Sequence, residues 1–500
     1  MNALRLDELS SLGVAITRLV ADSREVRAGD TFVAYPGARA DGRRYIAQAI
    51  ARGANAVIWD AHDFAWDPAW RVPHLALHDL RQQAGFIADK VYGQPSRRLQ
   101  MVGVTGTNGK TSISHWLAKS FSACNKKCAL IGTLGNGFAD ALQASANTTP
   151  DALRIHELLA QFVREAAQAT VMEVSSHALA QGRVNGVHFD VALLTNLTRD
   201  HLDYHGDMQH YAAAKRRLFD WDQLGHAVLN LDDSFGAELA LNLHDGGRVE
   251  VVGYGLQPGS LELARRRGLR MVQGALRQAD AQGLQLRLQT SWGEAELHSH
   301  LLGRFNASNL LGALAVLLVS GVPLDDAVRE LGMQRAVAGR MQAMGGRDVP
   351  TVVVDYAHTP DALENVLATL REVSVADGRL ICVFGCGGDR DRGKRPMMGK
   401  VADRFADARI ITSDNPRSET PRAIIDEIAA GMTGQYRVIE DRAHAINVAI
   451  AGARACDTVL IAGKGHEEYQ EIAGVRQPFS DSEIAQRALS VWVPKERWPT

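Results

Sequence analysis

Residues 99–112, LQMVGVTGTNGKTS, decide the fold of this chain. The apolar residues at its start predict a buried strand, and the glycines at 103, 106 and 109 predict the turn that ends the strand. A helical pattern, SISHWLAKSF, follows at once from Ser112. A strand, a glycine-rich loop and a helix in this order form the phosphate-binding unit of many α/β domains.

The loop at 103–112 departs from the common phosphate-binding pattern G-x-x-x-x-G-K-[ST], because position 104 is valine. Its chemistry is the same, since glycines let backbone N–H groups surround a phosphate and the start of the helix adds free donors. Lys110 is suited to neutralise the β and γ phosphates, and the hydroxyl of Thr111 is suited to bind Mg²⁺. The loop therefore predicts a nucleotide site, but it does not decide whether the protein is a hydrolase, a motor, a kinase or a ligase.

The rhythm of strand and helix continues downstream of the loop. Apolar runs predict more strands of a doubly wound parallel sheet, at 128–135, 169–177, 189–197 and 226–233. Period-two alternation then predicts an antiparallel hairpin at 283–302, and an apolar run predicts a buried helix at 305–321.

Two further units flank the central one. Upstream, the predicted elements are strands at 31–35, 55–60 and 73–79, a helix at 43–53 and a polar linker at 93–98. Downstream, four apolar runs end in polar loops, where open α/β sheets bind ligands: 351–358, 379–388, 408–417 and 457–467. We therefore predict an α/β protein of three domains, a small one at 1–97, a central P-loop-type one at 98–337 and a third at 338–500.

The composition is that of a globular protein with balanced charge. Lys and Arg total 55 and Asp and Glu total 57, so the net charge is −2, and we expect no nucleic-acid partner because such proteins usually carry a basic excess. We see no signal peptide and no apolar run of about 18 residues, so we expect a cytoplasmic protein without membrane insertion. The five cysteines are expected to be buried free thiols, rather than disulfides or a metal site at Cys382 and Cys386.

Two more strand ends carry side chains that suit a metal ion. Glu173 ends one apolar run, and Asp200 and His201 follow another. Mg²⁺ prefers oxygen ligands, which makes Glu173 and Thr111 reasonable partners. His201 is open between a metal ligand and a capping or packing residue. Lys215, in YAAAKRRLF, is open between a site residue and a solvated lysine beside two arginines.

A set of motifs occurs in one order along the chain: GVTGTNGKTS, EVSSH, TNLTRDHLDYHG with YAAAK, RFNASN, GRM, DYAHTPDAL, GCGGDRDRGKRP, DNPR and GKGHEEYQ. This set resembles the ATP-dependent Mur ligases of bacterial peptidoglycan synthesis, and among them the MurE type. The resemblance covers essentially the whole chain. It implies an N-terminal domain for the UDP end of the substrate, a central ATPase domain and a C-terminal Rossmann-like domain for an amino acid.

The resemblance implies an ATP-dependent amide ligase. ATP would phosphorylate the D-glutamate of UDP-N-acetylmuramoyl-L-alanyl-D-glutamate, and meso-diaminopimelate would then displace the phosphate, in a monomeric enzyme. Carboxylate and ATP are both anions, so lysine and Mg²⁺ must screen them. The alternatives are a lysine-adding MurE-type ligase, a folylpolyglutamate-synthase-like ligase and a nucleotide-gated binding subunit. A nucleotide-gated binding subunit would be expected to have lost Lys110, Glu173, His201 or Lys215, and all four are present.

The resemblance also assigns the ATP and metal sites. Lys110, Lys215 and His201 match catalytic residues, and the lysine matching Lys215 is carbamylated in the family (N6-carboxylysine). A carbamate there would help His201 to hold a second Mg²⁺. The implied metal set is Thr111, Glu173, His201 and carbamylated Lys215. The implied ATP set is Gly106, Thr107, Asn108, Gly109, Lys110, Thr111, Asn309, Arg340 and Asp355, with His358 in the same loop as Asp355.

Two more sets match the other substrates. The set implied for the UDP-muramoyl peptide is Ser23, Thr148, Thr149, Ser175, Gln181 and Arg183. For its serines and threonines, helix or turn capping is the alternative. The set implied for diaminopimelate is Arg390, Asp414, Asn415, Pro416, Arg417, Gly463 and Glu467.

Arg417, in SDNPRSE, is the residue expected to select the amino acid. Diaminopimelate is in effect lysine with a second carboxylate, and the fork of an arginine fits a carboxylate. Pro416 limits the conformations from which Arg417 reaches that group, and Glu467 is expected to take the distal ammonium. Thr420 and Pro421 are predicted as the N-cap and first residue of the next helix.

Overall fold

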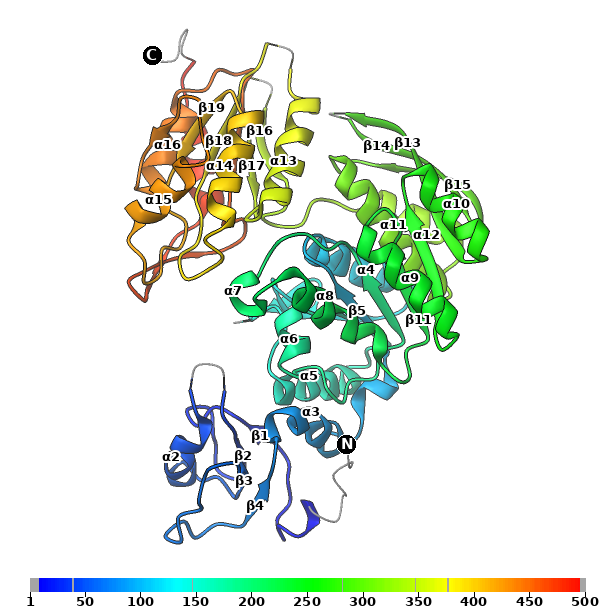
Figure 1. The fold of residues 1–500 in the computed structure, drawn as a ribbon, viewed down its shortest axis with the longest axis vertical. Coiled ribbons are helices and arrows are strands. Elements are labelled where there is room, and N and C mark those ends of the chain that lie inside the picture. Colours follow the sequence, from blue (N-terminus) through cyan, green and yellow to red (C-terminus); the bar gives the residue numbers. More distant parts are fainter. Residues whose placement is uncertain are drawn as a thin grey trace.

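Three α/β units, each built on its own sheet, follow one another along the chain (Figure 1). The computed structural model describes residues 9–37, 40–145, 147–280, 282–346, 348–375 and 377–494. The outermost residues of the predicted first and third domains, 1–8 and 495–500, lie outside the described residues. In Figure 1 the first unit lies at one end of the molecule, and the second unit lies between it and the third.

The first unit is a parallel sheet of four strands in the order β1-β2-β3-β4. Its elements are β1 (Leu19–Val20), β2 (Thr31–Ala34), η1 (Gly42–Tyr45), α2 (Ile46–Ala51), β3 (Ala56–Asp60), β4 (His74–Leu77) and α3 (Leu80–Val91). The three predicted strands and the helix are present. β1 was not predicted, because two residues are too few to show the alternation of apolar and polar side chains that indicates a strand.

The predicted linker at 93–98 is structured. It contains a short 3₁₀ helix, η2 (Pro95–Arg98), in which Ser96 is fully buried, and the Ser96 hydroxyl accepts a hydrogen bond from the backbone N–H of His188 at 3.0 Å. The core of the first unit also continues past this segment, since Ala152 and Leu153, at the start of α5 (Ala152–Arg164), pack among its buried residues. The first unit is thus packed directly against the second.

The second unit has eleven strands, and its central strands are parallel. The strands are β5 (Gln100–Thr105), β6 (Cys128–Gly132), β7 (Gly135–Phe138), β8 (Ala141–Gln143), β9 (Ala169–Glu173), β10 (Val191–Leu194), β11 (His226–Asn230), β12 (Glu250–Gly255), β13 (Arg270–Asp280), β14 (Gly283–Thr290) and β15 (Gly293–Ser299). The sheet order is β15-β14-β13-β12-β11-β10-β5-β9-β6-β7-β8. An antiparallel pair closes each edge, and the predicted hairpin at 283–302 is confirmed as β14 and β15.

Helices cover both faces of this sheet, as a doubly wound sheet requires. They are α4 (Lys110–Ala123), α5 (Ala152–Arg164), α6 (Ser176–Ala180), α7 (Leu202–His205), α8 (Met208–Arg216), η3 (Arg217–Asp220), α9 (Ser234–Gly246), α10 (Pro258–Arg267), α11 (Arg304–Val319) and α12 (Leu324–Gly332). α4 and α11 pack in one core, and α5 and α9 pack in the other. The predicted buried helix at 305–321 is confirmed as α11.

The third unit is a sheet of six strands in the order β16-β17-β21-β18-β19-β20, parallel except for β16. Its strands are β16 (Gln342–Gly346), β17 (Val349–Asp355), β18 (Leu380–Phe384), β19 (Ala408–Ile411), β20 (Arg437–Val438) and β21 (Thr458–Ala462), with a separate hairpin of β22 (Tyr469–Ile472) and β23 (Val475–Pro478). Its helices are α13 (Pro360–Val373), α14 (Lys394–Phe405), α15 (Pro421–Ala429), α16 (Arg442–Ala451) and α17 (Asp481–Ser490). All four predicted strands are present.

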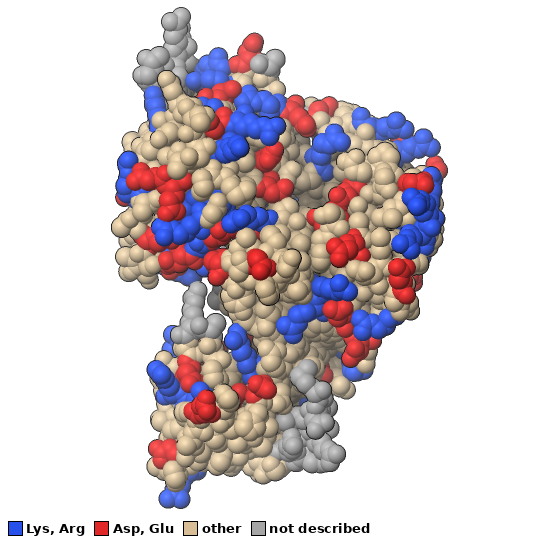
Figure 2. All heavy atoms as spheres, in the orientation of Figure 1, with Lys and Arg blue, Asp and Glu red and all other residues tan. Residues whose placement is uncertain are grey.

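The surface and the cysteines complete this description. Figure 2 shows basic and acidic side chains interspersed over the visible face. All five cysteines are free, and Cys128, Cys382 and Cys386 are buried as expected. The expectation of burial is wrong for Cys124 and Cys456, which are partly exposed. Within the described residues, no helix combines the length and apolar character needed to cross a bilayer.

Candidate active site

The phosphate loop lies between β5 and α4, where the sequence predicts it. Gly106 has φ +145° and Gly109 has φ +86°, conformations that suit glycine. A Cβ at Gly109 would lie 2.5 Å from Oδ1 of Asn309, so the loop leaves no room there for a side chain. This contact also brings Asn309, of α11, to the loop. Lys110 donates to the carbonyls of Gly106 and Thr107, both at 2.9 Å.

The predicted pair of Mg²⁺ ligands, Thr111 and Glu173, lies together. The Thr111 hydroxyl donates to Oε2 of Glu173 at 2.9 Å, and the Glu173 side chain is fully buried. Thr133, which was not predicted, donates its N–H and its hydroxyl to the same carboxylate at 2.8 and 2.9 Å. Hydroxyl and carboxylate oxygens are ligands that suit Mg²⁺, so the donor chemistry of this pair fits the ion.

Lys215 is deeply buried at the same loop, so the alternative of a solvated lysine is wrong. Its Nζ donates at 2.8 Å to the carbonyl of Gly106, which also accepts from Lys110. Burial, and then the charge of Lys110, lower the pKa of Lys215 well below its usual value. Burial also lowers the pKa of Lys110. Two lysine amines thus share one carbonyl oxygen at the phosphate loop.

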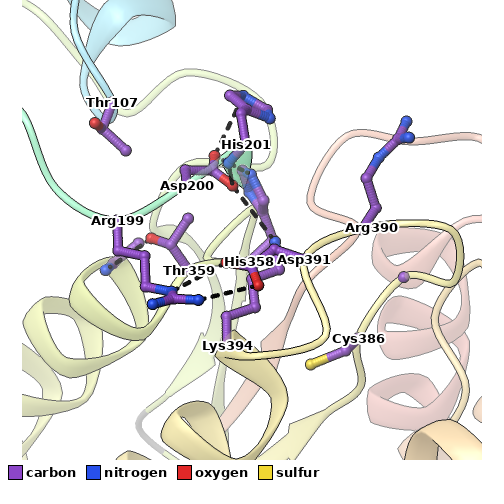
Figure 3. Close-up of polar contacts among 12 residues, drawn as sticks. Thr107, Arg199, Asp200, His201, His358, Thr359, Cys386, Arg390, Asp391 and Lys394 are labelled. Atoms are coloured by element: carbon purple, nitrogen blue, oxygen red, sulfur yellow. Dashed lines mark hydrogen bonds and ion pairs between the residues drawn. The ribbon is translucent and has the colours of Figure 1, made fainter. Parts of the chain in front are cut away.

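His201 lies in the loop before α7, next to a buried cluster around Asp200 (Figure 3). Asp200 lies 3.3 Å from His201 and, in the third unit, 3.4 Å from His358 and 3.6 Å from Lys394. Burial opposes ionisation of Asp200, but the hydrogen bond from His358 and the neighbouring charges outweigh burial and hold its pKa well below the usual range. Beside this cluster, Arg199 pairs with Asp391 at 3.0 Å.

The ring of His201 packs rather than caps. His201 occupies the N-cap position of α7 without a capping hydrogen bond from its side chain. Its ring lies edge-on to His177 and Tyr211, with centroids 4.8 and 6.1 Å away. In the part of the chain that the structure describes, no three His, Cys, Asp or Glu side chains form a group that could hold a metal. Among the predicted metal residues, a hydrogen bond joins Thr111 to Glu173, whereas within the described residues no hydrogen bond joins His201 to Lys215 or to that pair.

The third unit reaches the phosphate loop directly. Arg340 donates to the Thr111 hydroxyl at 3.2 Å, and its guanidinium lies 4.5 Å from the ring centroid of Tyr356. Asn108 donates to Asp361 at 2.9 Å. Asp361, in the motif DYAHTPDAL, was not predicted. Asp355 accepts the backbone N–H of Met341 at 2.7 Å, which fixes the segment next to Arg340.

Five of the six residues predicted for the UDP-muramoyl peptide lie together. Thr149 contacts Ser175 at 3.2 Å, and Arg183 donates to the carbonyl of Thr149 at 2.8 Å and to Gln181 at 2.7 Å. Thr148 approaches this group through Thr133, to which its hydroxyl lies at 3.1 Å. The capping alternative applies to Ser175, whose hydroxyl accepts the N–H of Ala178 and caps α6.

Ser23 is the exception in this set. It lies in the first unit, buried, and donates to Gln48 at 2.8 Å. Among the described residues, no hydrogen bond joins Ser23 to the other five. A substrate that touches all six must therefore extend from the second unit to the first.

The loop that carries Arg417 is held in an unusual backbone conformation. Arg417 has φ +54°, and its guanidinium donates to the carbonyl of Gly388 at 2.7 Å. Its backbone joins the β22–β23 hairpin, since its N–H donates to Glu471 and its carbonyl accepts from Ala473. His201, Met341 and Asp389 share this conformation, but so do residues far from the site such as Asp63 and Ala166, so the conformation alone does not mark a functional residue. Pro416 precedes Arg417, but the hairpin also fixes the loop.

The other residues predicted for diaminopimelate surround this loop unequally. Asn415 donates to Glu467 at 2.7 Å, and a Cβ at Gly463 would meet the carboxylate of Asp414. Arg390 is exposed, and its hydrogen bond is to the carbonyl of the neighbouring Asp389. Figure 3 shows Arg390 extending away from the cluster around Asp200. The structure thus joins Asp414, Asn415, Gly463 and Glu467, and Arg390 lies beside Arg417, since a Cβ at Gly387 would lie within 4 Å of both side chains.

A salt bridge beneath these loops holds them together and was not predicted. Buried Arg395 binds Glu419 at 2.7 Å, and Glu419 accepts the N–H of Asp389 at 2.6 Å. The hydrogen bond from Arg395 is the main cause that lowers the pKa of Glu419 to about 2. Thr420 and Pro421 are the N-cap and first residue of α15 as predicted, although the Thr420 side chain makes no capping hydrogen bond.

Family models match the chain in three places. The Mur ligase family catalytic domain matches residues 15–92, the Mur ligase middle domain matches 104–317, and the Mur ligase glutamate ligase domain matches 339–465. A protein named UDP-N-acetylmuramoyl-L-alanyl-D-glutamate–2,6-diaminopimelate ligase, from Chromobacterium violaceum, is 53% identical over 486 residues, which are 97% of this chain and 96% of that protein. A protein of the same name from Pseudomonas aeruginosa is 50% identical over 479 residues, 95% of this chain and 96% of that protein.

Solved structures agree with the fold. A structure titled as that same ligase matches with a TM-score of 0.65 and 36% identity over 95% of both chains. MurF ligase from Thermotoga maritima in complex with ADP matches with a TM-score of 0.66 and 18% identity, over 95% of this chain and 98% of that one, which shows the fold alone. The predicted three-domain α/β fold is confirmed. With its domain models in order and relatives about half identical over nearly its full length, the chain belongs to the Mur ligase family.

Proposed function

We propose that this ATP-dependent ligase joins meso-diaminopimelate to the D-glutamate of UDP-N-acetylmuramoyl-L-alanyl-D-glutamate, as the names of its relatives describe for them. The observation that carries the choice of amino acid is Arg417. Its guanidinium makes one hydrogen bond among the described residues, to Gly388, although it has five N–H donors. The remaining donors are suited to the second carboxylate that diaminopimelate has and lysine lacks.

The reaction that we propose has two steps. An oxygen of the D-glutamate carboxylate attacks the γ phosphorus of ATP, and ADP leaves. The amine of diaminopimelate then attacks the acyl carbon, loses a proton and displaces phosphate. The D-glutamate carboxylate and the ATP phosphates are anions and repel each other. Positive charge at the proposed phosphate site offsets this repulsion, and it comes from Lys110, Arg340 and the N-terminus of α4.

Mg²⁺ is proposed to bind at Thr111 and Glu173. Bound there, the ion would neutralise phosphate charge and orient the transferred group. The hydroxyl of Thr133 completes the oxygen set of that pair and would hold the Glu173 carboxylate in place. We propose His201 and Lys215 as ligands of a second ion.

We further propose that Lys215 carries a carbamate in the active enzyme. An uncharged amine is the form that adds CO₂, and burial lowers the pKa of Lys215. The modification turns this amine into an anion, which would attract the charge of Lys110 beside the Gly106 carbonyl. Loss of CO₂ mass on acidification of the protein would report the modification.

The remaining proposals concern the domains and their partners. We assign the UDP-muramoyl peptide to residues 1–97 with Thr148, Thr149, Ser175, Gln181 and Arg183, ATP to residues 98–337, and the amino acid to residues 338–500. The sheet of each unit lies within one of these ranges. We propose a monomer that works in the cytoplasm.

Release of phosphate tests the function. The full chain is incubated with ATP, Mg²⁺ and UDP-N-acetylmuramoyl-L-alanyl-D-glutamate, and either diaminopimelate or lysine is added. We expect phosphate release that depends on diaminopimelate, with formation of the tripeptide product. If lysine supports phosphate release as efficiently as diaminopimelate, the lysine-adding alternative is correct. If no phosphate is released with either amino acid, the proposal is refuted.

A further inference from the structure

A buried lysine, Lys464, lies at the centre of the proposed amino acid site. It follows β21, its side chain is fully buried, and the site assignments above give it no role. Its Nζ donates to Oδ1 of Asn415 at 3.0 Å and to Oε2 of Glu467 at 3.1 Å. Asn415 in turn donates to the same Oε2 at 2.7 Å. The three side chains form a closed ring of hydrogen bonds.

The ring fixes the orientation of each member. Oδ1 of Asn415 accepts from Lys464 and from the backbone N–H of Glu471, at 2.9 Å, so the amide nitrogen must face Glu467. Asn415 is itself buried. The rings of Tyr469 and Phe479 lie 5.4 and 5.9 Å from the ammonium of Lys464 and enclose it.

The hydrogen bonds of the ring use one carboxylate oxygen of Glu467 and leave the other available to a ligand. Both hydrogen bonds from the ring reach Oε2, and among the described residues no hydrogen bond reaches Oε1. The Glu467 side chain is 16% exposed, whereas that of Lys464 is 0% exposed. A ligand can therefore reach Glu467 but not Lys464. An ionised carboxylate accepts several hydrogen bonds, so Oε1 keeps its capacity to bind a donor.

Burial of an ammonium is costly unless a partner compensates it, and an apolar side chain would fill the same space at less cost. The presence of lysine here suggests a need for its charge. Lys464 balances the charge of Glu467 and holds one carboxylate oxygen in place while no ligand is bound. An incoming ammonium then finds an acceptor already oriented, which reduces the cost of ordering the site.

We propose that Lys464 is a positioning residue for amino acid selection, which orients Asn415 and Glu467 so that Oε1 of Glu467 receives the distal ammonium of the substrate. The inference rests on the proposed function. It assigns recognition of the distal ammonium to this ring, whereas Arg417 recognises the distal carboxylate. The ammonium and the carboxylate at the far end of diaminopimelate are thus bound by different residues.

The test compares diaminopimelate with 2-aminopimelate, which keeps one amine and both carboxylates but lacks the second ammonium. The variants are Lys464→Met, of similar length without charge, and Lys464→Gln, which retains a donor for Asn415. The matched control is Lys126→Met, because Lys126 is a partly buried lysine of the second unit that donates to the carbonyl of Ser320 at 3.4 Å. Values of kcat/KM for both amino acids and KM for ATP are measured for each protein.

We expect the wild-type chain to prefer diaminopimelate over 2-aminopimelate by roughly 10- to 100-fold, as one charged hydrogen bond provides. In Lys464→Met the ratio of the two kcat/KM values falls toward one, while KM for ATP and the ratio in Lys126→Met stay at wild-type values. A purely structural role would lower kcat/KM for both amino acids equally and leave the ratio unchanged, which would overturn the inference.

The same measurements separate three further outcomes. If Lys464→Met does not fold, the ratio in Lys464→Gln decides, and a wild-type ratio there overturns the inference. If the wild-type chain releases no phosphate with diaminopimelate, the proposed function fails and the inference fails with it. If wild-type activity is normal and the ratio does not change in the folded variants, the inference alone is wrong.

Discussion

Replacement of Arg417 by alanine should remove selection for diaminopimelate without unfolding the protein. The guanidinium makes one hydrogen bond within the described structure, to the carbonyl of Gly388 at 2.7 Å. Loss of that bond costs about 1 kcal/mol of folding free energy. Alanine at φ +54° is about as strained as arginine, so the backbone contributes little to the difference. A loss of activity can therefore not be attributed to unfolding.

The effect on the substrate should be larger than the effect on folding. A charged contact from the guanidinium to the distal carboxylate contributes about 1.5–3 kcal/mol, which is a rise of roughly 10- to 150-fold in KM for diaminopimelate. Lysine as substrate has no such carboxylate, so its kcat/KM should change little. In Arg417→Lys the charge remains but the fork is lost, and we expect an intermediate value.

The assay is phosphate release at varied diaminopimelate or lysine, with ATP and the UDP-muramoyl dipeptide saturating. The quantity that decides is the ratio of kcat/KM for the two amino acids. It should fall in Arg417→Ala by about the same factor as KM for diaminopimelate rises. An unchanged ratio, in a variant whose thermal unfolding matches the estimate above, would refute the assignment of Arg417.

Three further predictions follow from the site. Lys215→Ala should release phosphate at roughly 1% of the wild-type rate or less, as when a charge-stabilising group is lost, and added propionate should restore part of it; full activity without propionate would contradict the carbamate. Gly109→Ala places a Cβ 2.5 Å from Asn309 and should raise KM for ATP, whereas Gly93→Ala, at a glycine with positive φ and open space, should not; equal effects would contradict a specific role of this contact. Glu419→Gln should lower the free energy of unfolding at pH 7. Because the pKa of Glu419 is lowered from 4.5 to about 2, the difference from wild type should shrink as pH falls from 4.5 toward 2, and urea unfolding at several pH values would show whether it stays constant instead.

The strands, the phosphate loop and the order of the units could be predicted from the sequence, because each depends on local pattern. The contact of Thr111 with Glu173 was also predictable, since Glu173 ends one strand, Thr111 lies just beyond the loop that follows another, and the carboxyl ends of parallel strands meet at one edge. The doubly wound sheet, the hairpin at 283–302 and α11 are confirmed, and their prediction also depended on local hydrophobic pattern.

Contacts between segments far apart in the chain could not be predicted. Asp361 lies in a motif that the sequence displays, but its partner Asn108 is 253 positions away, and no local pattern indicates the pair. Lys464 likewise lies within GKGHE, yet its burial depends on Tyr469 and Phe479 of a hairpin region whose short strands have no clear period. Thr133 gives no signal at all, since a single threonine after a strand is ordinary.

The contacts between the second and third units have a consequence for recombination. All the residues that we assign to the amino acid lie in the third unit, so a crossover near 337–338 would exchange them together. The same unit, however, supplies Arg340 and Asp361 to the phosphate loop. A chimaera would therefore inherit from one parent both its specificity and these two contacts to the phosphate loop, and its ATPase activity would report how well the two parents match there.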